Sequence, residues 1–200
     1  KQIMAMFHLT FRKEFGQNFL TDRFVVEDIA DECCFDENST ILEIGPGIGT
    51  LTVAMLPLVH KVVAVEADKA LPPVLAETCS RDGEKLALVQ GDALRVSAEE
   101  LAAAAGAEPN KLVSNLPYQV AATVILGALQ HMPSVQLVVA MVQAEVADRI
   151  AARPGTKEYG AYTAKLSLFG RVTGRFEVGP HNFMPPPHVD SAVVRIDRVQ

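Results

Sequence analysis

The segment Asn115-Leu116-Pro117-Tyr118 combines hydrogen-bond acceptors for an amine with an aromatic ring. The side-chain carbonyl of Asn115 and the backbone carbonyls of Leu116 and Pro117 can accept both hydrogens of a planar amino group and so aim its lone pair. The proline stiffens the turn, and the ring of Tyr118 offers a stacking face worth about 1–3 kcal/mol for a base. These residues favour alkylation of an amino nitrogen through positioning and electrostatics. An isolated Asn-x-Pro is more often a β-turn, and the interpretation gains weight here because the segment follows the fourth apolar run.

Three glycines, Gly45, Gly47 and Gly49, follow an apolar run that ends at Ile44. Their backbone can approach a ligand closely, and a helix beginning after them would add positive potential. A dinucleotide-binding turn has the spacing G-x-G-x-x-G, whereas Thr50 stands at the third glycine position here. The spacing therefore favours a ligand without a pyrophosphate, with a generic glycine-rich turn as the alternative.

Acidic residues follow the next two apolar runs. Glu66 ends the run that begins at Lys61, where a carboxylate can accept both hydroxyls of a ribose. Asp92 follows the third run and can accept from an adenine amino group, although an N-cap aspartate has the same pattern. A solvated acid at a helix start is the alternative for Glu66. Together with the glycines, the two acids resemble the pattern of class I S-adenosylmethionine methyltransferases, which implies S-adenosyl-L-methionine as the cofactor.

The apolar runs that carry these residues alternate with helix-like segments, which predicts a doubly wound α/β sheet. Five strands buried on both faces are expected at Thr40–Ile44, Lys61–Val65, Leu86–Val89, Lys111–Ser114 and Val135–Val142. Helices are expected at Asp22–Cys34, Gly49–Leu56, Lys69–Ser80, Ala98–Ala105, Val120–Gln130, Glu145–Ala152 and Ala161–Phe169. The runs Val172–Val178 and Ser191–Asp197 predict a C-terminal antiparallel hairpin. The expected fold is a Rossmann-like α/β domain with a seven-stranded, mostly parallel sheet.

The composition is that of an ordinary globular protein. Of the 200 residues, 49% are hydrophobic and 21% are charged, which argues against disorder. Gln136 interrupts the longest apolar stretch and the first residues lack a signal-peptide pattern, so we expect a cytoplasmic protein with no membrane partner. The three cysteines, Cys33, Cys34 and Cys79, lack the spacing of a metal site or a disulfide framework, so we expect reduced thiols and no metal.

The net charge of −6 argues mildly against a large nucleic-acid footprint. One stretch, Arg149–Arg175, is nevertheless basic, with Glu158 as its one acidic residue. Its cations are Arg149, Arg153, Lys157, Lys165, Arg171 and Arg175. They could line a nucleic-acid path, or they could belong to a solvated helix face.

Further segments make a closer resemblance. These further segments are Phe15–Leu20, Met141–Ala147, Tyr159-Gly160 and Phe183–Val194, and they add to the segment Asn115–Tyr118. In this order they resemble the KsgA-type ribosomal RNA adenine dimethyltransferases. The resemblance implies N6,N6-dimethylation of two adjacent adenines in the 3′-terminal hairpin of 16S rRNA, with the small ribosomal subunit as partner and the enzyme acting as a monomer.

The resemblance also implies a role for each matching residue. Residues 1–21 would close over the cofactor and residues 22–200 would form the catalytic domain. The implied cofactor-binding residues are Gln17, Asn18 and Leu20 at the methionine part, Gly45 and Gly47 through their backbone, Glu66 at the ribose, Asp92 at the adenine amine, and Asn115. The implied catalytic residues are Asn115 and Pro117, which hold the target amine, and Tyr118 and Phe183, which stack on the target base. Without the family, Phe183 would be interpreted as a core aromatic.

The sequence departs from the family pattern in its negative charge, in the acidic Glu14 of its first residues, and in ending before the usual C-terminal helical domain, which we therefore expect to be absent. Three other functions remain open at this point. They are methylation of large-subunit RNA or DNA, a ribosome-assembly binding module without catalysis, and a nucleotide-dependent oxidoreductase.

Overall fold

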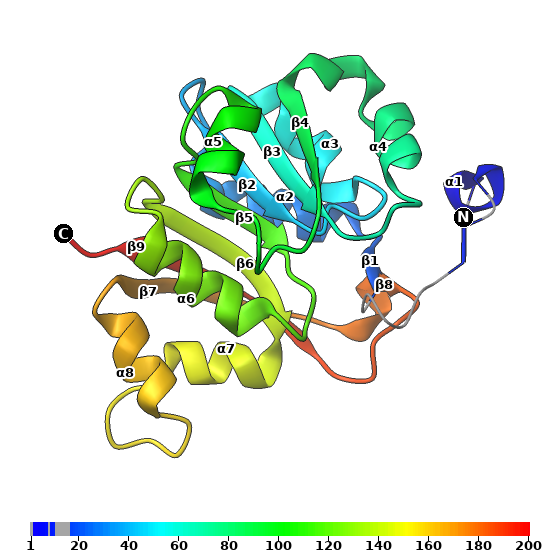
Figure 1. The fold of residues 1–200 in the computed structure, drawn as a ribbon. Helices are drawn as coiled ribbons and strands as arrows, with labels where there is room; N and C mark the ends of the chain where they lie inside the picture. The colour runs from blue at the N-terminus through cyan, green and yellow to red at the C-terminus, as the bar shows by residue number, and fades with distance from the viewer. Residues whose placement is uncertain (1, 8, 11–16) are drawn as a thin grey trace.

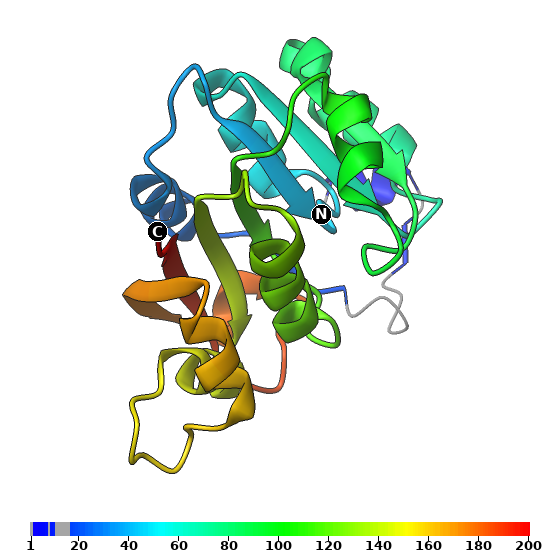
Figure 2. The same cartoon turned by 60° about the vertical axis from the view of Figure 1, so that its left-hand side comes forward.

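The computed structural model describes residues 2–7, 9–10 and 17–200. These residues form a central sheet with helices on both of its faces (Figure 1 and Figure 2). The seven strands are β2 (Thr40–Ile44), β3 (Lys61–Glu66), β4 (Leu86–Gln90), β5 (Lys111–Asn115), β6 (Leu137–Gln143), β7 (Gly170–Val178) and β9 (Ser191–Arg198). Their order is β4-β3-β2-β5-β6-β9-β7. The predicted Rossmann-like, mostly parallel sheet of seven strands is confirmed.

The order of the strands creates a switch point between β2 and β5. The chain passes from β2 to β3 and β4 on one side, and then returns to β5 and β6 on the other side. All of these neighbours pair in parallel, whereas β9 is antiparallel to both β6 and β7. Ligands of open α/β sheets bind at the carboxyl ends of the strands at such a switch point.

Two apolar cores enclose the sheet. The helices α2 (Arg23–Cys33), α3 (Thr50–Met55) and α4 (Pro72–Thr78) share one core, and α5 (Ala98–Ala105), α6 (Ala121–His131), α7 (Ala144–Ala151) and α8 (Ala161–Ser167) share the other. Successive strand residues alternate between them, so that Ile41 joins the first core and Leu42 the second. The shorter helical segments are α1 (Gln2–Met6), η2 (Leu56–Leu58), η3 (Ser80–Lys85) and η4 (Pro180–Asn182). No helix among the described residues has both the length and the apolar character that crossing a membrane requires.

One expectation about the strands is wrong. The run Leu86–Val89 was expected to be buried on both faces, but each of its residues is only partly buried and Gln90 is exposed. The reason is topological, since β4 lies at the edge of the sheet with β3 beside it. The length and apolar character of a run predict a strand without distinguishing a central position from an edge.

The predicted antiparallel pair at the C-terminus is β7 with β9, joined by residues 179–190. This connection forms a second, two-stranded sheet, in which β8 (Phe183–Met184) pairs with β1 (Phe19–Leu20). The backbone N–H of Thr21 also donates to the carbonyl of Asn182 at 2.8 Å. The segment before α2 is therefore attached to the C-terminal connection; the division of the chain at residues 21 and 22 stays a prediction.

Candidate functional site

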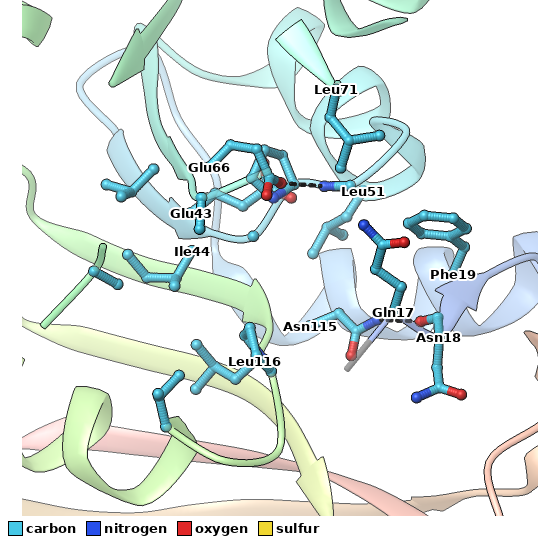
Figure 3. A pocket seen from close by; sticks show the side chains of 18 of the residues that line it. Gln17, Asn18, Phe19, Glu43, Ile44, Leu51, Glu66, Leu71, Asn115 and Leu116 are labelled. Carbon is cyan, nitrogen blue, oxygen red and sulfur yellow. Dashed lines mark hydrogen bonds between the residues drawn. The ribbon is translucent and has the colours of Figure 1, made fainter. Parts of the chain in front are cut away.

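A cavity of about 480 Å³ lies at the carboxyl ends of β2, β3, β4 and β5 (Figure 3). This volume falls within the range of roughly 300–1,000 Å³ that is usual for small-ligand sites. The lining residues fall within the segments 17–20, 43–51, 65–71, 91–93 and 115–120. With the exception of Phe183, every residue implied for the cofactor or the target lines this cavity. Strands far apart in sequence thus bring the predicted residues together.

The glycine turn leaves little space beside its backbone. Gly45 and Gly47 have φ of +68° and +61°, a region that side chains rarely adopt. A Cβ on Gly45 would lie 3.3 Å from Cγ of Pro117, and one on Gly47 would lie 2.9 Å from Cε1 of Phe19. The turn therefore packs closely against both the Asn-Leu-Pro-Tyr segment and the N-terminal segment.

Glu66 is nearly buried, with 5% of its surface exposed, where β3 ends beside the glycine turn. Its Oε2 accepts from the N–H of Gly47 at 3.2 Å, and its Oε1 accepts from the N–H of Asp68 at 2.9 Å. Burial raises the pKa of Glu66, and these two hydrogen bonds oppose the shift. Each carboxylate oxygen keeps capacity for a further donor, so the group can accept two adjacent hydroxyls.

Glu43 is an acidic residue of the cavity that the sequence interpretation did not assign. Its side chain is 2% exposed, and its Oε2 accepts from Oγ1 of Thr52 at 2.6 Å. Burial raises the pKa of Glu43 to about 8, and the nearby charge of Glu66 adds to this. The sequence did contain a signal for this buried acid, because Glu43 lies inside the apolar run Thr40–Ile44 and must be buried if that strand is central.

We expect Glu43→Gln to remove a pH dependence of folding stability. Because the pKa of Glu43 rises from 4.5 unfolded to about 8 folded, the folded state retains a proton that the unfolded state loses. The wild-type free energy of unfolding should thus decline between pH 4.5 and pH 8, by roughly 3–5 kcal/mol at most, and the variant should lack this decline. Urea unfolding of both proteins across this range measures the difference; identical profiles would show that Glu43 is not the titrating group.

Asn115 is oriented by the N-terminal segment. Its Nδ2 donates to the carbonyl of Asn18 at 3.3 Å, as the dashed line in Figure 3 marks. Because a carbonyl can only accept, this contact directs the nitrogen toward Asn18 and leaves Oδ1 on the other side of the amide. Among the described residues, none donates a hydrogen bond to this oxygen. The side-chain carbonyl is thus available to a ligand, and its role as an amine acceptor stays a prediction.

The two backbone carbonyls after Asn115 differ in their partners. The carbonyl of Pro117 accepts from the N–H of Val120 at 3.2 Å. The carbonyl of Leu116 accepts no hydrogen bond from the described part of the chain, while its N–H donates to Met141 at 3.1 Å. The role assigned to Pro117 as an amine acceptor stays a prediction, and the structure favours Leu116 as the more available acceptor.

Tyr118 and Phe183, the two expected stacking residues, lie in different surroundings. The hydroxyl of Tyr118 is hydrogen-bonded to Oγ of Ser191 at 2.9 Å, and the half-buried side chain lines the cavity. Burial raises the pKa of this hydroxyl, so it stays neutral. Phe183 is only 4% exposed and belongs to the core beside Leu20. The ring of Phe183 is thus buried in this core, as its interpretation without the family would have it, and its role as a stacking residue stays a prediction.

The remaining predicted residues border the cavity. Nε2 of Gln17 donates to Oδ2 of Asp68 at 2.8 Å, and Leu20 is buried at 3% exposure. Asp92 accepts at Oδ1 from the N–H of Leu94 at 2.9 Å, so it both holds its own turn and faces the cavity. Phe15 and Gly16, which belong to the resembling segment Phe15–Leu20, lie outside the described residues, as does Glu14.

Cys33 and Cys79 are buried and Cys34 is exposed, and all three thiols are free. Burial raises the pKa of Cys79 and brings that of Cys33 to about 12, which keeps both thiols protonated and unreactive.

Comparison with known proteins agrees with this geometry. The chain matches the family described as "Ribosomal RNA adenine dimethylase" over residues 8–200. It is 42% identical over 190 residues to a Rhodococcus erythropolis protein named "Ribosomal RNA small subunit methyltransferase A", covering 93% of this chain and 62% of that relative. A Corynebacterium diphtheriae protein of the same name is 39% identical over 201 residues, covering 98% of this chain and 66% of the relative. The chain thus spans less than two thirds of the length of the first of these relatives.

Two solved structures share the fold. A dimethyladenosine transferase from Plasmodium falciparum superposes with a TM-score of 0.80 and 28% identity, covering 90% of this chain and 63% of that chain. The 23S rRNA methyltransferase ErmE has a TM-score of 0.76 and 25% identity, covering 91% of this chain and 70% of that chain. Because the family match extends over nearly the whole sequence and the cavity contains the motif residues, the chain belongs to the ribosomal RNA adenine dimethylase family.

Proposed function

We propose that this chain transfers methyl groups from S-adenosyl-L-methionine to the N6 amines of two adjacent adenines in the 3′-terminal hairpin of 16S rRNA. The observation that carries the proposal is the fixed amide of Asn115, whose Oδ1 is left open beside the glycine turn. The names of the curated relatives support the small ribosomal subunit as the substrate. The likeness to ErmE makes large-subunit RNA the second candidate.

The cavity suits the proposed cofactor. The carboxylate of Glu66 can accept the two ribose hydroxyls, and Asp92 can accept from the adenine amine. Gly45 and Gly47 line the cavity, so their backbone would lie directly against the ligand. Gln17, Asn18 and Leu20 would border the methionine part. When bound, the cofactor supplies an electrophilic methyl group on a positively charged sulfur.

The protein's contribution to the reaction is to orient the amine. Oδ1 of Asn115 and the carbonyl of Leu116 would accept the two amine hydrogens, which turns the nitrogen lone pair away from the ring plane and toward the methyl carbon. An amine nitrogen that gains a methyl group becomes acidic, so it would release one proton to water without a strong base from the protein. Tyr118 would hold the base on its ring, anchored by Ser191. The catalytic effect therefore rests on positioning and fixed dipoles.

Labelled methyl transfer to small ribosomal subunits that lack the modification tests this proposal. Primer extension on the product should stop at the two adjacent adenines, because dimethyladenine blocks the polymerase. Transfer to naked large-subunit RNA in preference to small subunits would favour the second candidate. Binding of NAD without binding of S-adenosylmethionine in calorimetry would contradict both.

The basic stretch offers a surface for the RNA backbone. Within it, Arg149 pairs with Glu145 at 3.4 Å and Arg175 pairs with Asp148 at 2.8 Å. Four cations of this stretch are exposed and form no ion pair within the described residues: Arg153, Lys157, Lys165 and Arg171. Unpaired cations lose no existing partner when they contact phosphate, so we propose that these four help to bind RNA.

Replacing these four cations with glutamine should weaken binding to undermethylated small subunits by about tenfold or more at moderate salt. The slope of log affinity against log salt should also become shallower by up to about 3. Filter binding across a salt series measures both quantities. A double variant of exposed arginines elsewhere, Arg23→Gln with Arg81→Gln, is the control and should leave the slope nearly unchanged. An unchanged slope in the quadruple variant would indicate a merely solvated surface.

A further inference from the structure

Regular pairing of β2 with β5 stops before either strand ends. The last pair is Leu42 with Leu112. On their other sides, β2 stays paired with β3 as far as Ile44, and β5 stays paired with β6 as far as Asn115. Continuing the register would place Ile44 opposite Ser114. The two central strands thus separate at the cavity, at the switch point where cofactor and target must meet.

The hydroxyl of Ser114 bridges the separated strands. Its Oγ accepts from the N–H of Ile44 at 3.2 Å and donates to the carbonyl of Ile44 at 2.6 Å. Ser114 is 2% exposed and Ile44 is 5% exposed, so water cannot easily replace these bonds. A hydroxyl carries one donor and two acceptor sites. One side chain therefore satisfies both main-chain groups of Ile44 that face β5, which would be costly to leave unpaired.

This bridge joins the residues that precede the two halves of the site. Ile44 is followed by Gly45 of the glycine turn, and Ser114 is followed by Asn115. The glycine turn and the Asn-Leu-Pro-Tyr segment also approach each other just beyond this bridge, because a Cβ on Gly45 would lie 3.3 Å from Cγ of Pro117. A change at the bridge would shift the glycine turn relative to the amide of Asn115.

We propose that Ser114 is a positioning residue, whose hydroxyl sets the separation between the cofactor turn and the acceptors of the target amine. The inference rests on the proposed methyl transfer. The effect should fall on the transfer step. Glu66 and Asp92, which would contact the cofactor, lie at the end of β3 and in the turn after β4, on the side of β2 away from Ser114. Loss of the hydroxyl should thus slow transfer far more than it weakens cofactor binding.

The test compares Ser114→Ala with Ser114→Thr, which keeps the hydroxyl. Single-turnover transfer to undermethylated small subunits, at saturating cofactor and substrate, should slow by about 10–100-fold in the alanine variant, as expected for a misplacement near 1 Å. Calorimetry should find the affinity for S-adenosylmethionine within about threefold of wild type. The threonine variant should recover most of the transfer rate. A structural role alone would not separate rate from affinity in this way.

Ser134→Ala is the matched control. Oγ of Ser134 donates to the carbonyl of Pro109 at 2.8 Å, and these two residues precede β6 and β5. The contact therefore lies at the amino ends of the strands, whereas the cavity lies at their carboxyl ends. The control variant should transfer at the wild-type rate. A folded Ser114→Ala protein with the wild-type rate, or a threonine variant as slow as alanine, would overturn the proposal.

If the alanine variant does not fold, Ser114→Cys takes its place, because it keeps the size of the side chain with only a weak donor. Slower transfer with retained affinity in this variant supports the role of the hydroxyl, and an unchanged rate refutes it. Absence of transfer by the wild-type protein would instead refute the proposed function.

Discussion

Asn115→Ala should reduce single-turnover methyl transfer by roughly 10²–10³-fold, the loss typical of deleting one preorganised polar group at a reacting centre. The variant removes the Oδ1 that would accept an amine hydrogen and the Nδ2 that donates to Asn18 at 3.3 Å. Affinity for S-adenosylmethionine should stay within a few-fold of wild type, because Glu66 and Asp92 remain. Quench-flow with labelled cofactor and undermethylated subunits measures the rate, and calorimetry measures the affinity.

Asn110→Ala provides the matched control for this experiment. Asn110 directly precedes the same strand, β5, and its amide accepts from the N–H of Thr40 at 3.0 Å and donates to the carbonyl of Asn38 at 2.9 Å. Losing these bonds should lower the free energy of unfolding without changing the transfer rate of the folded protein. Transfer by Asn115→Ala at near the wild-type rate would mean that the amide does not hold the target amine.

Asn115→Asp separates the presence of the acceptor from its orientation. Aspartate keeps a side-chain oxygen but has no donor for the carbonyl of Asn18, so the carboxylate should turn away from Asn18. We expect transfer to remain at least about tenfold below wild type. Equal activity of the aspartate variant and wild type would show that the bond to Asn18 does not orient the group.

Most of the fold could be predicted from the sequence because its elements carry local signals. The strand Thr40–Ile44 and the helix Ala98–Ala105 have the predicted bounds. The helix begins after the capping box of Ser97 and Glu100 and ends at Gly106 in the left-handed conformation. By contrast, the two-residue strands β1 and β8 have no periodicity of their own and exist through pairing with each other.

The site could be predicted to the extent that its residues stand at strand ends. Parallel strands bring their carboxyl ends to one edge, so the glycine turn, Glu66, Asp92 and Asn115 were expected to meet, and all line one cavity. The pairing of β8, which contains Phe183, with residues 19–20 could not be predicted, because neither two-residue strand carries a local signal. Ser114 and Glu43 were visible as polar residues inside apolar runs, but their partners, Ile44 and Thr52, come from the tertiary arrangement and the following helix.

Glu66→Ala should weaken S-adenosylmethionine binding by about 10²-fold, since two hydrogen bonds to a charged group are lost and part of this loss is recovered by hydration. Glu66→Gln, which keeps one acceptor oxygen, should have an intermediate affinity. Glu100→Gln removes the same charge at the exposed capping box of α5 and should bind as wild type does. An alanine variant with wild-type affinity would exclude Glu66 from the ribose contact.

The pH dependence of binding tests the same carboxylate in the wild-type protein. Because burial raises the pKa of Glu66 above 4.5, protonation begins at a higher pH than for an exposed glutamate, and the protonated group loses acceptor strength. Affinity for S-adenosylmethionine should therefore fall as the pH is lowered through this raised pKa, and binding within that window should release protons. Calorimetry in buffers of different ionisation enthalpy measures the release, and Glu66→Gln should abolish it. Titration of the ligand's own groups is common to both proteins, so a release that persists unchanged in the variant would assign it to the ligand and not to Glu66.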